Sequence, residues 1–99
     1  MTAIDVTTAF DMNSTTRETR LGSAKRGYSG VIRQIAADGV NSSLPPLELE
    51  SRLLELGFVE GARVEVLHEG IVGGDPIAVR IDNVTVAMRR REAMAIIVV

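Results

Sequence analysis

The side chains that could bind a transition metal are one histidine and the carboxylates near it. His68 is the only histidine of the 99 residues, and the chain contains no cysteine. Glu69 and Asp75 follow closely and could act as further ligands. A firm transition-metal site usually has three or more protein ligands, preferably with nitrogen or sulfur donors. We therefore expect no bound metal or other cofactor, and His68 is kept as the single, weak metal-ligand candidate.

A run of three arginines is the densest group of positive charge. Arg89, Arg90 and Arg91 follow one another, and because side chains alternate along a strand, two of them are expected to point outward. They could contact an anionic partner, such as a protein loop, a phosphate group or lipid headgroups. The alternative is a solvated face that pairs with Glu92 and other acids. Arg89 and Arg90 are thus candidate partner-binding residues, and both interpretations stay open.

Patterns typical of catalysis or of nucleic-acid binding are not found in the sequence. The segment Gly73-Gly74-Asp75-Pro76 lacks the Gly-Lys-Ser/Thr ending and the following helix of a phosphate-binding loop, so a β-turn explains it. No serine, histidine and acid form a recognisable nucleophile arrangement. The formal net charge is −2 and only 3% of residues are aromatic, which does not fit a basic, base-stacking face. We expect no catalytic residue, no enzymatic activity and no nucleic-acid partner.

Length and hydropathy indicate one domain without a membrane span. A chain of 99 residues is enough for one domain. The longest apolar run, residues 93–99, is far shorter than the roughly 20 residues of a membrane-spanning helix. The N-terminal residues carry Asp5 and Asp11 and no apolar segment typical of a secretory signal. The lack of cysteine fits a reducing cytoplasm.

The first 26 residues differ in composition from the rest of the chain. They are rich in serine and threonine, and their few apolar residues are too sparse to build a core. We predict a polar, flexible tail over residues 1–26 and a folded domain over residues 27–99.

A helix joined directly to a strand organises the folded domain. Leucines recur at helical spacing over residues 47–56, and Gly57 then supplies the left-handed residue with which many helices end. After Gly61, charged and apolar residues alternate strictly, as in a strand with one buried face. The predicted strands are residues 31–36, 62–68, 77–81, 84–89 and 95–99, with a loop over residues 69–76 and a single helical turn over residues 91–93. This order predicts a mainly β fold: a small SH3-like β-barrel of about five strands, with one α-helix in the first long connection.

The helix carries more leucines than one sheet surface needs. Leu49, Leu53 and Leu56 form the stripe expected to pack on the core, whereas Leu47 and Leu54 lie off that stripe. We predict that Leu47 and Leu54, together with Phe58, form an exposed apolar patch for a partner or for self-association. The apolar C-terminal strand is a second candidate, since an unpaired edge there could recruit another strand.

Four sequence blocks resemble the ferrous iron transport protein A (FeoA) family. They are Arg52-Leu53-Leu54-Glu55-Leu56-Gly57-Phe58-Val59-Glu60-Gly61 with Val64-Glu65-Val66, then Gly74-Asp75-Pro76-Ile77, then Met88-Arg89-Arg90-Arg91-Glu92-Ala93, and Ile96-Ile97-Val98. The sequence departs from the family pattern in three respects. Glu60 stands where the family usually has proline, Met88 replaces a leucine, and the N-terminal tail is longer.

The resemblance implies a cytoplasmic SH3-like barrel that supports Fe(II) uptake by the membrane GTPase transporter FeoB. The family is thought to act by protein–protein contact, so the protein would sit at the inner membrane through its partner. A related barrel forms the C-terminal domain of the iron-dependent DtxR-like repressors. The alternative function is therefore a direct metal-binding or metal-sensing module.

Overall fold

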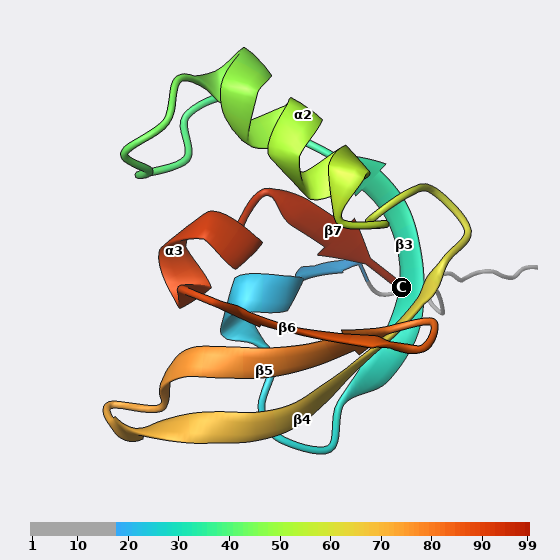
Figure 1. The fold of residues 1–99 in the computed structure, drawn as a ribbon, viewed down its shortest axis with the longest axis vertical. Helices are drawn as coiled ribbons and strands as arrows, with labels where there is room; N and C mark the ends of the chain where they lie inside the picture. Colours follow the sequence, from blue (N-terminus) through green and yellow to red (C-terminus); the bar gives the residue numbers. More distant parts are fainter. Residues whose placement is uncertain (1–17) are drawn as a thin grey trace, which may run out of the picture.

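The computed structural model describes residues 18–99. In this range the chain forms six β-strands, two α-helices and one short 3-10 helix (Figure 1). In chain order these are β2 (Thr19–Arg20), η1 (Leu21–Ser23), β3 (Ser29–Ile35), α2 (Pro46–Glu55), β4 (Arg63–Val72), β5 (Asp75–Ile81), β6 (Val84–Met88), α3 (Arg90–Ala93) and β7 (Ile96–Val98). No helix among these residues is long and apolar enough to cross a membrane.

The strands form a single curled sheet. Their order is β2-β7-β3-β4-β5-β6, and each neighbouring pair is antiparallel. Figure 1 shows the sheet curling around the interior of the molecule, with α2 lying outside it. The prediction of a mainly β fold with one helix in the first long connection is confirmed, because α2 lies between β3 and β4.

A sixth strand lies in the segment that the sequence assigned to the polar tail. Thr19 and Arg20 pair with Val98 and Ile97 of β7, and Leu21, which follows, is completely buried. The folded unit therefore begins earlier than the predicted boundary at residue 27. A two-residue strand is too short to show an alternating pattern, so only the partner strand reveals it. The rest of the predicted tail, residues 1–17, lies outside the described residues.

The predicted loop over residues 69–76 is wrong. Pairing of β4 with β5 continues through Glu69↔Ile77 to Val72↔Asp75, so only Gly73 and Gly74 form the turn. Both glycines have positive φ, 66° and 74°, which suits the two-residue hairpin turns that match the twist of the strands. Gly70 indicates a loop from sequence alone. In the structure it sits inside β4, where a Cβ would lie 2.2 Å from the Asp75 carbonyl oxygen.

The C-terminal strand has no free edge. β7 lies between β2 and β3 in the sheet and pairs with both. The prediction that its edge could recruit another strand is therefore wrong. The reason is the early strand β2, which covers the side of β7 that β3 does not.

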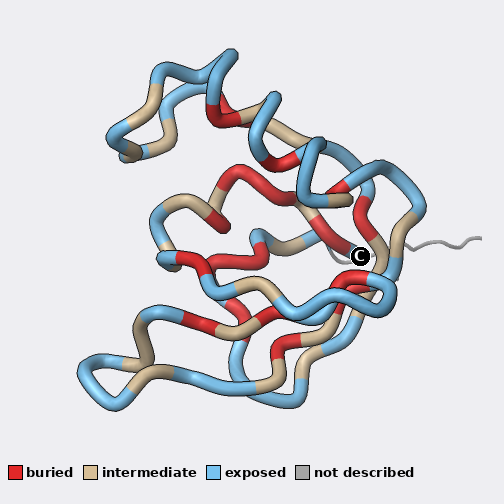
Figure 2. Tube along the Cα trace, in the orientation of Figure 1, coloured by how far each residue is buried: buried red, intermediate tan, exposed pale blue. Residues whose placement is uncertain are grey.

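The core gathers inside the curl of the sheet and beneath α2. Figure 2 shows buried positions along the strands and in α2, where the buried residues are Leu49 and Leu53. Leu49 and Leu53 of α2 are 1% and 2% exposed, as predicted, whereas Leu56 is 36% exposed. Leu49 and Leu53 belong to one apolar cluster with buried residues of the strands. The strand residues include Ile32, Val64, Val66, Ile77, Val79, Ile81, Ile96 and Val98.

The end of α2 is determined by its glycine. Gly57 has φ 106°, and its N–H donates to the Leu54 carbonyl, while the Phe58 N–H donates to the Leu53 carbonyl at 3.0 Å. These two bonds form a Schellman motif, in which the residue after the glycine packs back onto the last helical turn. Phe58 and Leu53 are both buried as a result. This motif determines which face of α2 turns toward the core and which toward solvent.

Candidate functional site

The outward face of α2 carries two exposed leucines. Leu47 is 78% exposed and Leu54 is 43% exposed. They are two helical turns apart in sequence, so they lie on one face, opposite the buried Leu49 and Leu53. Hollows of about 350 Å³ and 240 Å³ flank this ridge, the first lined in part by Leu47 and the second by Leu54. The structure thus places both predicted leucines in one exposed apolar ridge.

Acidic side chains surround the leucine ridge. Glu48, Glu50 and Glu55 belong to α2, and Glu60 follows it and lines the hollow beside Leu54. Arg52 is the one cation of the helix. In the part of the chain that the structure describes, none of these four carboxylates forms an ion pair. We call Leu47, Leu54 and the four glutamates the α2 surface; it suits an apolar partner segment that carries positive charge.

Phe58 does not belong to this exposed surface. Its exposed fraction is 0%, so the prediction that it lines a partner-binding patch is wrong. The reason is the Schellman motif, which turns its ring into the core. Leu56 and Val59, at the end of the helix and after it, are 36% and 45% exposed. Sequence reasoning assigned Leu56 to the core stripe and gave Val59 no role, because a helix that ends at Gly57 breaks the periodicity on which the assignment depends.

Arg90 is a structural residue and not a free partner-binding group. Its Nε donates to the Gly74 carbonyl at 2.8 Å, and one terminal nitrogen donates to the carbonyls of Gly22 and Ala24 at 3.1 and 2.6 Å. The other terminal nitrogen pairs with the Glu69 carboxylate. The planar guanidinium has enough donors to serve all of these acceptors at once. Arg90 therefore fastens the β4–β5 turn and the segment after η1 to α3.

Arg89 is available to solvent. Its side chain is 59% exposed and reaches the Asp75 carboxylate only at 4.0 Å. The expectation of alternation along a strand fails here, because β6 ends at Met88 and Arg90 already begins α3. Of the two arginines predicted to bind a partner, only Arg89 remains exposed for that role.

The leucine ridge and the arginines do not form one site. Figure 1 shows α2 at one end of the molecule and the β4–β5 turn, to which Arg89 and Arg90 are linked, at the other. The structure therefore separates the predicted partner-binding residues into two surfaces.

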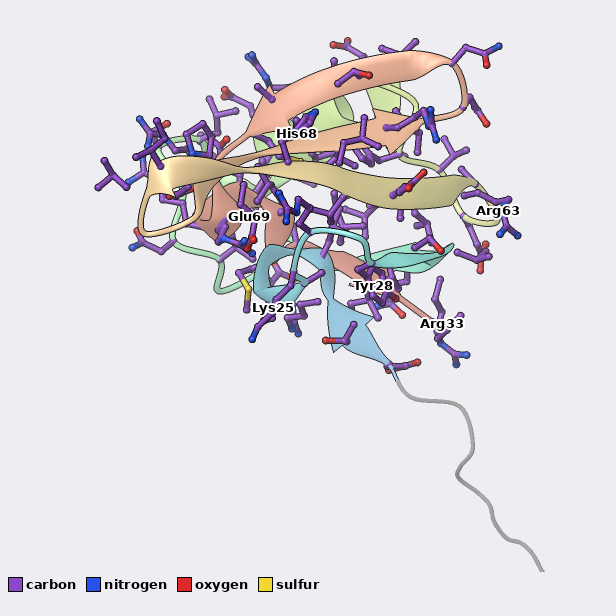
Figure 3. All side chains as sticks on the ribbon, turned by 90° about the horizontal axis from the view of Figure 1, so that it is seen from below. Lys25, Tyr28, Arg33, Arg63, His68 and Glu69 are labelled. Atoms are coloured by element: carbon purple, nitrogen blue, oxygen red, sulfur yellow. The ribbon has the colours of Figure 1, made fainter. Side chains whose placement is uncertain are left out.

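His68 lies apart from any assembled ligand set. It is an exposed residue of β4, opposite Ala78, where the register of the β4–β5 pair shifts. Figure 3 shows His68 and Glu69 on opposite sides of the β4 ribbon. The Glu69 and Asp75 carboxylates are both engaged by Arg90, through its side chain and its backbone N–H. Among residues 18–99 no three His, Cys, Asp or Glu side chains are close enough to hold a metal ion.

Tyr28 is a packing residue with a perturbed phenol. Burial raises the pKa of the Tyr28 phenol above its ordinary value. The ring lies against Gly30, where a Cβ would stand 2.5 Å from the phenol oxygen. The phenol is therefore neutral near pH 7, and it closes the side of β3 on which no larger residue than glycine fits.

Proteins of known family and structure share this architecture. The curled antiparallel sheet with this strand order defines the class of small SH3-like β-barrels, as predicted, and the helix in its first long connection is an added element. The FeoA domain model matches residues 19–99, and the chain belongs to the FeoA family. No curated protein matched the sequence.

Two solved FeoA structures illustrate the similarity. The crystal structure of Stenotrophomonas maltophilia FeoA complexed with zinc, described as a procaryotic SH3 domain protein, is 30% identical, with a TM-score of 0.65. The match covers 81% of this chain and 88% of that one. The solution structure of Chlorobium tepidum FeoA is 32% identical with a TM-score of 0.64, over 81% of this chain and 68% of that one.

A transcriptional repressor contains a similar domain. A manganese-dependent transcriptional repressor is 27% identical, with a TM-score of 0.66. The match covers 87% of this chain but only 43% of the repressor. The present chain thus resembles one part of that larger protein.

Proposed function

We propose that this protein is a cytoplasmic accessory factor for ferrous iron uptake that binds the membrane GTPase transporter FeoB. Membership of the FeoA family supports a role in iron transport. The S. maltophilia relative is described as a candidate ferrous iron transport activating factor. In this proposal the protein acts by contact and catalyses no reaction of its own, and it reaches the inner membrane through its partner.

The observation that carries the proposal is the exposed leucine ridge of α2. Leu47 is 78% exposed and Leu54 is 43% exposed, although the two other leucines of this short helix, Leu49 and Leu53, are buried. Burying such a side chain in an interface contributes about 1.5–3 kcal/mol. The surrounding glutamates favour a FeoB segment that combines apolar residues with lysine or arginine, and they would raise the association rate at low salt.

The test is binding to detergent-solubilised FeoB under anaerobic conditions. We expect Leu47→Asp/Leu54→Asp to weaken binding by about a hundredfold or more, because two leucines lose their burial and two carboxylates would have to leave water in an apolar contact. Ile71→Asp is the matched control, since Ile71 is a fully exposed aliphatic residue far from α2.

Equal binding by the leucine variant and the wild type would contradict the α2 assignment. Loss of self-association in the leucine variant, with FeoB binding unchanged, would assign the ridge to a second copy of this chain. Failure of the wild-type protein to bind at all would contradict the partner. Direct metal sensing, the other function that the sequence leaves open, is not proposed, because Glu69 and Asp75 are held by Arg90.

A further inference from the structure

The turn between β4 and β5 exposes two aliphatic side chains. Ile71 is 102% exposed and Val72 is 83% exposed, the two largest values among the exposed large hydrophobic residues of the described chain. Gly73 and Gly74 complete the turn, which projects from the body of the molecule in Figure 1. We call residues 71–74 the hairpin tip. Neither side chain contributes to the core, and a two-residue glycine turn does not require them.

Positively charged side chains are held next to the hairpin tip. Arg90 binds the carbonyl of Gly74 in the tip and the carbonyl of Ala24, which directly precedes Lys25 and Arg26. Lys25 and Arg26 are exposed and form no ion pair within residues 18–99. Figure 3 shows Lys25 toward the turn side of the molecule, near Glu69 and away from Arg33 and Arg63.

The two acids at this end, Glu69 and Asp75, already have partners within the protein. Glu69 pairs with the Arg90 guanidinium, and Asp75 accepts the Arg90 backbone N–H at 2.9 Å. Arg89 is 59% exposed and only loosely paired with Asp75. The exposed cations toward this end are therefore Lys25 and the loosely paired Arg89. Around the α2 ridge, four carboxylates outnumber the one cation of the helix, Arg52, which forms no ion pair within residues 18–99.

We propose that the hairpin tip is a membrane anchor that inserts Ile71 and Val72 into the interfacial layer of an anionic phospholipid bilayer. Aliphatic side chains backed by lysine and arginine bind there, because the apolar atoms leave water while the cations meet lipid phosphates. A convex, projecting tip fits a deformable lipid surface, whereas a protein partner would need a matching cavity.

This inference is independent of the proposed contact with FeoB. The tip and α2 lie at opposite ends of the molecule (Figure 1), so the α2 surface stays accessible while the tip touches the bilayer. The contact would concentrate the protein on the membrane and turn α2 away from it. Both interactions can then act at the same time without competing for residues.

The test is flotation of the full chain with protein-free vesicles. One set contains equimolar phosphatidylglycerol and phosphatidylcholine, and the other contains phosphatidylcholine alone. We expect binding to the anionic vesicles that is at least tenfold stronger than to the neutral ones. Because each cation near an anionic surface is worth a factor of about five, Arg89→Gln should lower binding by about that factor.

The decisive variant is Ile71→Ser/Val72→Ser, which should lower binding to anionic vesicles at least tenfold. Its fold should be intact, since both residues are exposed, and circular dichroism checks this. Leu47→Ser, which removes an exposed leucine from the acidic surface, is the matched control and should bind like the wild type.

Three results would overturn the inference. The wild-type chain could fail to float with anionic vesicles. The Ile71→Ser/Val72→Ser variant could float as well as the wild type, which would leave only an electrostatic contact of the basic residues. Finally, vesicles could bind neither the wild-type chain nor the Ile71→Ser/Val72→Ser variant, while the variant loses binding to solubilised FeoB. This result would make the tip a protein contact. Because the vesicles contain no protein, the first two results do not depend on the proposed contact with FeoB.

Discussion

The α2 surface and the hairpin tip both expose aliphatic side chains, but they differ in charge and in how they are held. The leucine ridge is surrounded by four glutamates, whereas exposed cations flank the tip. The ridge belongs to a helix whose opposite face is part of the core. The tip is held by Arg90, which bonds to Gly74 of the turn, Gly22 of η1 and Glu69 of β4. The difference teaches that one small barrel can expose two apolar surfaces whose surroundings differ in charge.

The largest expected effect is the loss of the core contact that orients α2. Phe58→Ala removes a completely buried ring and should lower the free energy of unfolding by about 3–5 kcal/mol. Urea denaturation followed by circular dichroism measures this. Ile71→Ala, at the exposed tip, should change it by less than about 0.5 kcal/mol. Similar losses of unfolding free energy in both variants would mean that Ile71 is packed against the protein. The hairpin tip would then not be a free surface.

A smaller effect is expected from the arginine that holds the tip. Arg90→Ala leaves the Gly22, Ala24 and Gly74 carbonyls without this donor and should cost about 2–3 kcal/mol, as hydrogen bonds to charged groups do. Hydrogen exchange should become faster at residues 71–76 but not in α2. The control Arg89→Ala should cost less than about 0.5 kcal/mol, because its ion pair is exposed and long. Faster exchange in α2 alone would contradict the assignment of Arg90 to the tip.

The smallest effect concerns Tyr28, which can report on the fold outside both surfaces. Since burial raises the pKa of its phenol in the folded state, folding favours the protonated form. The corresponding stability is present below the ordinary tyrosine pKa of about 10 and is lost as the pH rises through the folded-state value. Unfolding free energy should therefore fall more steeply above pH of about 10 in the wild type than in Tyr28→Phe.

Ultraviolet absorbance of the phenolate measures this titration directly, because the chain contains one tyrosine. The pKa should remain raised in Leu47→Asp and in Ile71→Ser, since neither variant disturbs the core. A return of the pKa to its ordinary value in either variant would show that the variant altered the fold as well as its surface.

Much of the fold could be predicted because its signals are local. The leucine spacing of α2, the glycine that ends it and the alternation after Gly61 each lie within a few residues of the structure that they determine. The β4–β5 turn was missed because Gly70 and the Gly73-Gly74 pair both indicate a loop. Only pairing with β5 shows that Gly70 belongs to a strand, where the Asp75 carbonyl leaves no room for a side chain.

The candidate site was predicted only in part. Leu47 and Leu54 could be recognised because a helix has a defined outer face. Phe58 was misassigned although its signal is local, since the motif at Gly57 turns its ring into the core. Arg90 could not be assigned from spacing, because its side chain binds groups that are distant in sequence. The carbonyls that Arg90 binds at Gly22 and Ala24 are 68 and 66 positions away in sequence.

The amino-acid sequence by itself determined the helix, its glycine end, most strand positions and the family, because these depend on periodicity and on neighbouring residues. Only the tertiary structure decided which leucines and arginines remain free. Burial and hydrogen bonding depend on which segments meet, and here the strand before residue 21 and the final strand meet across the whole length of the described chain. That long-range pairing is also what leaves the C-terminal strand without a free edge.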